Sequence, residues 1–223
     1  AGLWAIKDRQ KECAWCITPA ISLSFNLLSD LFKLKPQREY LLWRGLLRRA
    51  LTASDAAYEG GKGSAGFLSV IDPGKPEETR LGKVITLPMS LYSLWGAKET
   101  YIAQLELLAV LVALIEVAGL VRGANTIWFV DNIAALMALV RGSSNSRSLD
   151  QMAKLVHRAC FAIRSVPYFE YVESAANWAD EISRKGTQGS WAPDNCFSVE
   201  KCGIAAELLT LPSLAVIKIF EYW

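Results

Sequence analysis

The sequence lacks an excess of charge of either sign. Its 24 lysines and arginines are matched by 22 aspartates and glutamates, so the net charge is only +2. The overall balance therefore gives no indication of a polyanion-binding protein. Basic residues do gather between positions 33 and 49, where Glu39 is the one acid and Tyr40 and Trp43 are interleaved. This basic stretch predicts either a solvated helix face or a contact with a phosphate backbone.

The sequence also lacks the cysteine pattern of a secreted protein. Its five cysteines are irregularly spaced, and no charged-then-apolar signal segment opens the chain, so we expect an intracellular, reduced protein of the cytoplasm or nucleus. Cys13 and Cys16 form a CxxC pair that Cys196 and Cys202 could complete as a zinc site, although the spacing of the second pair is poor for zinc. Ordinary buried thiols are the favoured alternative.

A long uninterrupted hydrophobic run is absent as well. The longest apolar stretch, residues 105–121, is interrupted by Glu106 and Glu116 and has helical spacing. It therefore predicts a buried helix and no membrane span. A chain of 223 residues with 52% hydrophobic content predicts one main domain with flanking segments.

What is present is a change of pattern near residue 50. Residues 1–48 favour helix, with an amphipathic stretch at 22–34, and predict a helical lead-in segment. Three short strands are then predicted at 50–58, 66–71 and 83–87, separated by turns rich in glycine and proline. This spacing favours an antiparallel meander.

After the meander, helix and strand patterns alternate. Helices are predicted at 101–120, 132–140, 149–165 and from about 177, and strands at 126–130 and 168–172. The alternation adds parallel strands to the meander, which predicts an α/β fold with a mixed five-stranded sheet flanked by helices. We expect this domain to span residues 49–186, and residues 187–223 form a C-terminal tail of unknown role.

Four acids lie where the local pattern changes or where a charge is out of place. They are Asp55 in the first strand, Glu106 among apolar helical neighbours, Asp131 at a strand end, and Asp180 at a helix start. Each has an ordinary explanation: a turn for Asp55, a salt bridge for Glu106, an N-cap for Asp131, and a helix-dipole contact for Asp180. Four such coincidences in one order on one sheet are less plausible than a metal site that cuts phosphodiesters.

The order and setting of these acids resemble ribonuclease H, and especially the RNase H domain attached to reverse transcriptases of DIRS-like and Ty3-like retroelements. The stretches that carry the resemblance are YIAQLELLA at 101–109, FVDNIAAL at 129–136 and NWADEISR at 177–184. The resemblance covers residues 50–185 and implies the RNase H-like fold. Residues 1–48 would resemble the connection that follows a polymerase, and a chain beginning at Ala1 would fit excision from a polyprotein.

The resemblance implies an endonuclease that cleaves the RNA strand of RNA/DNA hybrids. Asp55, Glu106, Asp131 and Asp180 would hold two Mg²⁺ ions, for which Mn²⁺ could substitute. The partners would be the hybrid and an adjacent reverse transcriptase domain. The 2′-hydroxyls of the RNA would be read in the minor groove, and the weaker candidates for this role are Asn132, Arg141, Ser143 and Arg147.

One departure from the family concerns histidine. Cellular RNases H carry a histidine in the loop before the last acid, whereas residues 173–176 here are Glu-Ser-Ala-Ala and the one histidine of the chain, His157, lies within a predicted helix. We expect His157 to be a surface or packing residue. The absence of a histidine from the loop predicts a slower enzyme.

Other functions remain as alternatives. A domesticated, non-catalytic RNase H-like module that binds nucleic acid or protein would keep the fold but lose acids, and this chain keeps all four. A proofreading exonuclease would need a second acid at position 57, where the chain has Ala57. A transposase would use glutamate as its last ligand, and Glu181 stands beside Asp180.

Overall fold

The computed structural model describes residues 48–88, 90–95 and 101–203, and also five helical positions, 22, 25, 26, 28 and 29, within the predicted amphipathic stretch. The chain divides into two compact units, residues 1–45 and 46–223, and the fold below is that of the second. The remainder of the lead-in, the Cys13–Cys16 pair, most of the basic stretch and residues 204–223 lie outside the described part.

The centre of the domain is a six-stranded sheet of order β5-β4-β1-β2-β3-β6. β1 (Arg49–Glu59), β2 (Lys62–Ile71) and β3 (Thr79–Leu87) form the expected antiparallel meander. The β1–β2 turn is tight because Gly60 and Gly61 adopt positive φ angles of 56° and 78°, which glycine does without steric penalty.

Parallel strands complete the sheet on the other side of β1. β4 (Asn125–Val130) pairs in parallel with β1, and β5 (Val166–Tyr171) pairs in parallel with β4. The predicted α/β class and the mixed sheet flanked by helices are thereby confirmed.

The sheet has one strand more than predicted. β6 (Ser198–Lys201) pairs in parallel with the edge of β3, from Leu81–Ser198 to Val84–Lys201. A four-residue strand made mostly of exposed polar residues leaves little local signal, and its pairing depends on an edge strand more than a hundred residues earlier. The sheet therefore continues beyond residue 186, into the segment that the sequence left unplaced.

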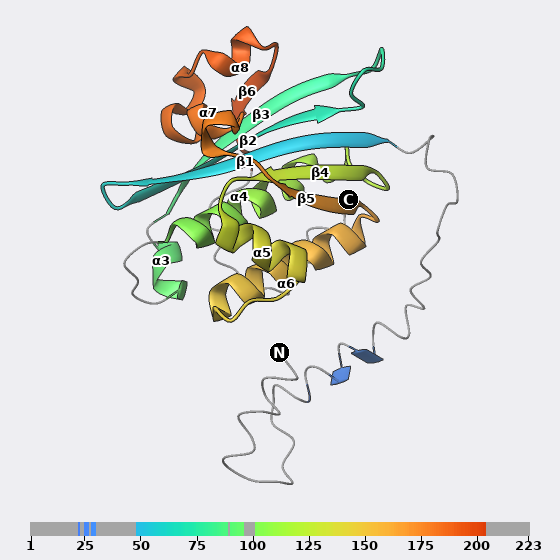
Figure 1. Cartoon of the computed structure of the whole chain (residues 1–223), viewed down its shortest axis with the longest axis vertical. Helices are drawn as coiled ribbons and strands as arrows, with labels where there is room; N and C mark the ends of the chain where they lie inside the picture. The colour runs from blue at the N-terminus through green and yellow to red at the C-terminus, as the bar shows by residue number, and fades with distance from the viewer. Residues whose placement is uncertain are drawn as a thin grey trace. The chain divides into compact units, whose positions relative to one another are not determined.

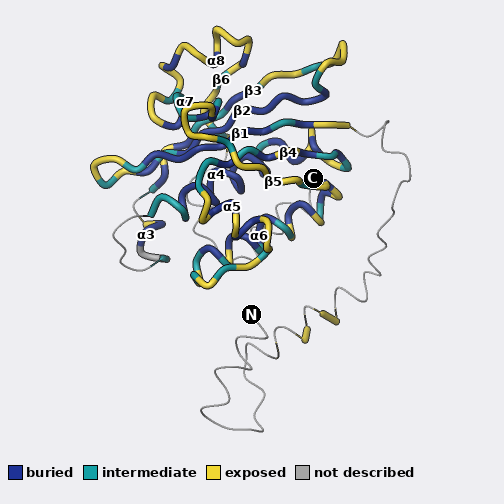
Figure 2. Tube along the Cα trace, viewed as in Figure 1, coloured by how far each residue is buried: buried dark blue, intermediate teal, exposed yellow. Residues whose placement is uncertain are grey.

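Helices cover the two faces of the sheet unequally (Figure 1). One face carries α3 (Ser90–Trp95), α4 (Ile102–Val117), α5 (Ile133–Arg141) and α6 (Arg147–Ala162) over the larger hydrophobic core. The opposite face carries α7 (Asp180–Lys185) and α8 (Trp191–Asp194) over a smaller core. α4 is buried along almost its whole length (Figure 2), because it packs against the sheet on one side and α6 on another.

The last helix predicted from the sequence begins later than expected. Residues 174–176 form a 3-10 turn, and α7 starts at Asp180, three residues after Asn177. The side chain of the buried Asn177 donates to the Ser54 carbonyl (3.1 Å) and accepts from the Ala179 amide (3.1 Å). Asn177 therefore fastens the approach to α7 onto β1 and does not cap the helix.

Candidate metal centre

The register between β1 and β4 places two of the acids opposite each other. The last parallel pair of these strands is Ala53–Phe129, and Asp55 and Asp131 each lie two residues further along. Beyond that pair β1 and β4 no longer pair with each other. The carboxyl ends of parallel strands are where polar sites gather in α/β sheets.

The third acid comes from α4, the helix packed against β1. Glu106 lies in the second turn of the helix and is only 2% exposed. Its Oε1 atom accepts a hydrogen bond from the Ala56 amide at 3.3 Å, next to Asp55. Its Oε2 atom is buried and has no hydrogen-bond donor among the described residues. A buried carboxylate oxygen without a donor is costly unless a proton or a cation lies against it.

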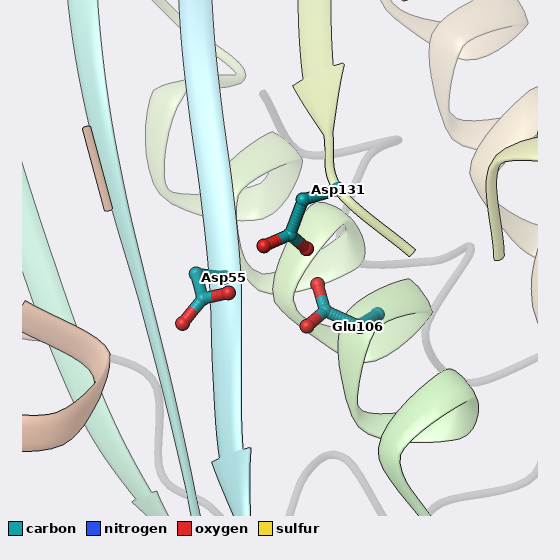
Figure 3. Close-up of side chains that lie close together, drawn as sticks. All are labelled: Asp55, Glu106 and Asp131. Carbon is teal, nitrogen blue, oxygen red and sulfur yellow. The ribbon is translucent and has the colours of Figure 1, made fainter. Parts of the chain in front are cut away.

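Asp55, Glu106 and Asp131 therefore converge from three different elements (Figure 3). One carboxylate oxygen of each lies within 4.8 Å of those of the other two. Asp55 and Glu106 are buried and Asp131 is half-buried, so the cluster is closed on the sheet side and reachable at Asp131. This spacing allows a single ion to touch all three.

The electrostatics of the cluster show why it favours a cation. Burial, opposed by the Ser183 hydrogen bond and reinforced by repulsion from Asp131 and Asp180, raises the pKa of Asp55 to about 6. Burial together with repulsion from Asp55 and Asp131 raises the pKa of Glu106 well above its usual value. Both shifts mean that the ionised cluster is unfavourable by itself, and a positive charge at its centre removes that penalty.

The fourth predicted acid lies outside the cluster of three. Asp180 begins α7, has a 37% exposed side chain, and accepts from the Nε atom of Arg184 at 3.0 Å. It is close enough for its charge to raise the pKa of Asp55. Asp180 thus stands at the rim of the site, held by an arginine that also lies 3.7 Å from Glu59.

Ser183 is a site residue that the sequence did not reveal. Its hydroxyl donates to Asp55 Oδ2. The Asp180 carbonyl oxygen lies 2.9 Å from the Ser183 hydroxyl oxygen. The hydroxyl has one proton, and the charged carboxylate is the stronger acceptor. The only sequence signal was position: Ser183 lies three residues after Asp180, on the same face of a short helix.

A glycine allows α7 to come this close. Gly66 is the strand partner of Asp55 across β1 and β2. A Cβ atom at Gly66 would lie 2.9 Å from Cγ1 of Ile182 and 3.2 Å from the Ser183 amide nitrogen. The missing side chain is therefore what lets α7 pack onto the sheet and bring Ser183 to Asp55.

The weaker nucleic-acid candidates lie on and after α5. Asn132 is the N-cap of α5, since its side chain accepts from the Ala135 amide at 3.1 Å, and this leaves the neighbouring Asp131 free of the capping role. Arg141 ends α5, Ser143 lies between α5 and α6, and Arg147 begins α6, and all three are exposed. Nothing in the geometry assigns them a ligand.

The two remaining residues weighed from the sequence have structural partners. His157 is half-buried, with Nε2 2.6 Å from the Leu139 carbonyl at the end of α5 and its ring edge-on to Phe169, as expected for a packing residue. Glu181 accepts from Lys185 Nζ (2.9 Å) and from the Trp191 amide (2.7 Å), which lowers its pKa. It does not join the cluster, so the transposase alternative loses its last ligand.

No protein-family model matches the sequence, and no curated protein matches it. Among solved structures, it is similar to RNase H1 from the halophilic archaeon Halobacterium salinarum (18% identity, TM-score 0.42, 58% of this chain and 89% of that one). It is also similar to the N-terminal RNase H domain of a Mycobacterium tuberculosis protein (15% identity, TM-score 0.45, 66% of this chain and 98% of that one). A third similar structure is LC9-RNase H1 (15% identity, TM-score 0.40, 58% of this chain and 65% of that one).

Proposed function

We infer that this protein is a metal-dependent nuclease that hydrolyses phosphodiester bonds at the Asp55–Glu106–Asp131 cluster. The observation that carries this inference is the approach of three carboxylates to within 4.8 Å, together with a buried Glu106 oxygen that has no donor in the described part of the chain. Such an arrangement is unfavourable without a cation.

The donor set fits a hard divalent ion. Every ligand is a carboxylate oxygen, which Mg²⁺ and Mn²⁺ prefer over softer donors. Asp55, Glu106 and Asp131 would hold the metal, and Asp180 at the rim would be the fourth acid of a two-ion site. When bound, divalent ions at such a site supply an activated water and counter-charge for the reacting phosphate.

Hydrogen bonds orient two of the three ligands. The Ala56 amide fixes one oxygen of Glu106, and the Ser183 hydroxyl fixes one oxygen of Asp55. Asn132 caps α5, so the carboxylate of Asp131 is not needed there. Ligands oriented by such hydrogen bonds bind a metal without first having to reorganise.

We propose that the substrate is the RNA strand of an RNA/DNA hybrid and that the metal ion is Mg²⁺. The support is the sequence resemblance at residues 101–109, 129–136 and 177–184. The same resemblance favours a retroelement polyprotein as the source, with residues 1–48 as a connection segment and a reverse transcriptase domain as neighbour. Asn132, Arg141, Ser143 and Arg147 remain candidates for contacts with the nucleic acid.

One observation favours a second candidate, a non-cleaving nucleic-acid- or protein-binding module. The Arg184 guanidinium is bonded to Asp180, and a positive charge against the fourth acid opposes a second metal ion there. In such a module the hybrid would be bound without being cut.

The experiment is cleavage of a hybrid labelled on its RNA strand by the purified full chain. We expect RNA fragments in Mg²⁺ or Mn²⁺, none in EDTA, and none from Asp131→Asn, which removes one charge and preserves shape. An all-DNA duplex of the same sequence is the substrate control and should stay intact. Hybrid that is bound but uncut by the wild-type chain in metal would establish the non-cleaving module instead.

A further inference from the structure

A pocket of about 540 Å³ lies beside the acid cluster, on the α7 face of the sheet. Its lining comes from the 3-10 turn and the residues after it, from α7, and from Trp191 of α8. Its volume falls within the range of about 300–1,000 Å³ that small ligands occupy in proteins. It is too small to take a duplex.

The pocket is connected to the cluster through shared residues and one hydrogen bond. Asp180 and Arg184 belong both to its lining and to the rim of the acid site. The wall at Asn177 is bonded to the Ser54 carbonyl, one residue before Asp55. A strand whose phosphate lies at the three carboxylates therefore has this pocket as a neighbour.

Two tryptophans give the pocket its aromatic surface. Trp178 is half-buried between Phe129 and Phe197, with ring centroids 5.9 and 6.5 Å away. Trp191 is stacked on Phe197 at 6.2 Å and 27°, and remains 37% exposed. These ring contacts position both indoles, and each indole remains partly exposed, as a stacking surface requires.

The charges around the pocket point to a neutral planar ligand. Lys185 pairs with Glu181 at 2.9 Å and Arg184 with Asp180 at 3.0 Å, so two acids and two bases of the lining already neutralise each other. A free phosphate would meet two acids as well as two bases. An aromatic base, which needs a flat surface and peripheral hydrogen-bonding groups, suits this lining better.

We propose that the pocket binds one unpaired nucleobase of the strand that runs next to the acid cluster. Trp191 and Trp178 form the stacking surface, and the exposed Arg184 lies where the sugar-phosphate backbone enters. The protein then prefers a hybrid with a single-stranded end over a fully paired one. This inference rests on the proposed function, since it needs nucleic acid at the carboxylates.

The test is binding of labelled hybrids by fluorescence anisotropy, with Asp131→Asn as background to prevent cleavage. A blunt hybrid is compared with hybrids that carry one unpaired nucleotide at each of the four strand ends in turn. We expect tighter binding of about fivefold or more for at least one extension, since stacking of one base on an aromatic side chain contributes factors of this order. The same extension with an abasic residue should give no gain.

Substitutions at the pocket identify its role. Trp191→Ala should abolish the preference for the extended hybrid, and Trp191→Phe should retain part of it. Tyr168→Ala removes an aromatic side chain that is 61% exposed on the edge strand β5 and should leave the preference unchanged. Melting curves establish that each variant is folded.

The outcomes separate this proposal from the proposed function. Equal affinity for blunt and extended hybrids, or a preference that survives Trp191→Ala in a folded protein, would overturn the base pocket while leaving the nuclease intact. Failure to bind any hybrid, together with failure of the wild-type chain to cut one in metal, would overturn the proposed function and the pocket with it.

Discussion

The hydroxyl of Ser183 on α7 donates a hydrogen bond to the carboxylate of Asp55 on β1, and both side chains are buried. The two residues are 128 positions apart in the chain. This contact joins the smaller core on the α7 face of the sheet to the acid cluster between β1 and the carboxyl end of β4. It also opposes the effect of burial on the pKa of Asp55, and so favours the ionised form that a metal needs.

Ser183→Ala should weaken metal binding without removing a ligand. Asp55 loses its donor, so we expect about tenfold lower affinity for Mn²⁺ or Mg²⁺, as is common when a group that orients a ligand is lost. The matched control is Ser64→Ala, because the Ser64 hydroxyl donates to the Ser183 carbonyl and not to Asp55. Calorimetric titration of both variants measures the difference. Equal metal affinity in the two variants would contradict a role for Ser183 in orienting Asp55.

Glu106→Gln should stabilise the metal-free protein and abolish cleavage. The change removes a buried negative charge from beside Asp55 and Asp131, and we expect a gain of about 1–3 kcal/mol in EDTA. Added Mg²⁺ should stabilise this variant less than it stabilises the wild type. Thermal melts with and without metal provide the measurement.

Glu116→Gln is the control for that substitution, on the same helix. Glu116 is paired with Lys83 at 2.6 Å, so neutralising it leaves a cation without its partner and should lower stability. In EDTA, Glu106→Gln should therefore raise the free energy of unfolding and Glu116→Gln should lower it. A loss of stability for both would show that Glu106 is held as an ordinary structural ion.

The raised pKa values predict a pH dependence that metal reverses. Asp55 ionises at about 6 in the folded protein and at 3.8 as a free side chain, so the unfolded state loses its proton first. Stability from this group is present below about pH 4 and is lost as the pH rises through about 6. Glu106, with its pKa also raised, extends the loss to higher pH.

Metal binding needs the ionised carboxylates, so its stabilising effect should grow over the same range. We expect the melting temperature in EDTA to fall between about pH 5 and about pH 7.5, and the increase produced by Mg²⁺ to become larger. Melting temperatures across this range, with Asp131→Asn alongside, measure both effects. A metal effect that does not change with pH would argue against these acids as ligands.

Arg184→Ala should tighten metal binding. It removes a positive charge that is bonded to Asp180 and lies near Asp55, and it frees the rim acid to face an ion. Because the pair is more than half exposed at the arginine, the expected gain is modest, about two- to fivefold in affinity. Lys185→Ala breaks the adjacent pair with Glu181 and should leave metal affinity unchanged. Mn²⁺ titration without nucleic acid provides the test.

Local pattern carried enough information to predict most of the architecture. β1 and α4 were predicted within a few residues of their observed bounds, because strand alternation, glycine turns and a long apolar helix are local signals. The acids stood out because Glu106 interrupts an apolar helix and Asp131 ends an apolar strand. Their order along the chain was enough to suggest the RNase H-like fold.

The sequence by itself determined the chemistry available: three strands and then alternating helices, with acids at fixed places among them. Only the tertiary structure decided which of those acids meet. It placed Asp55, Glu106 and Asp131 together through the β1–β4 register and left Asp180 on the rim with Arg184. It also added β6 and the Ser183 contact. These features depend on contacts between residues far apart in the chain, and such contacts leave no periodic signal in the sequence around them.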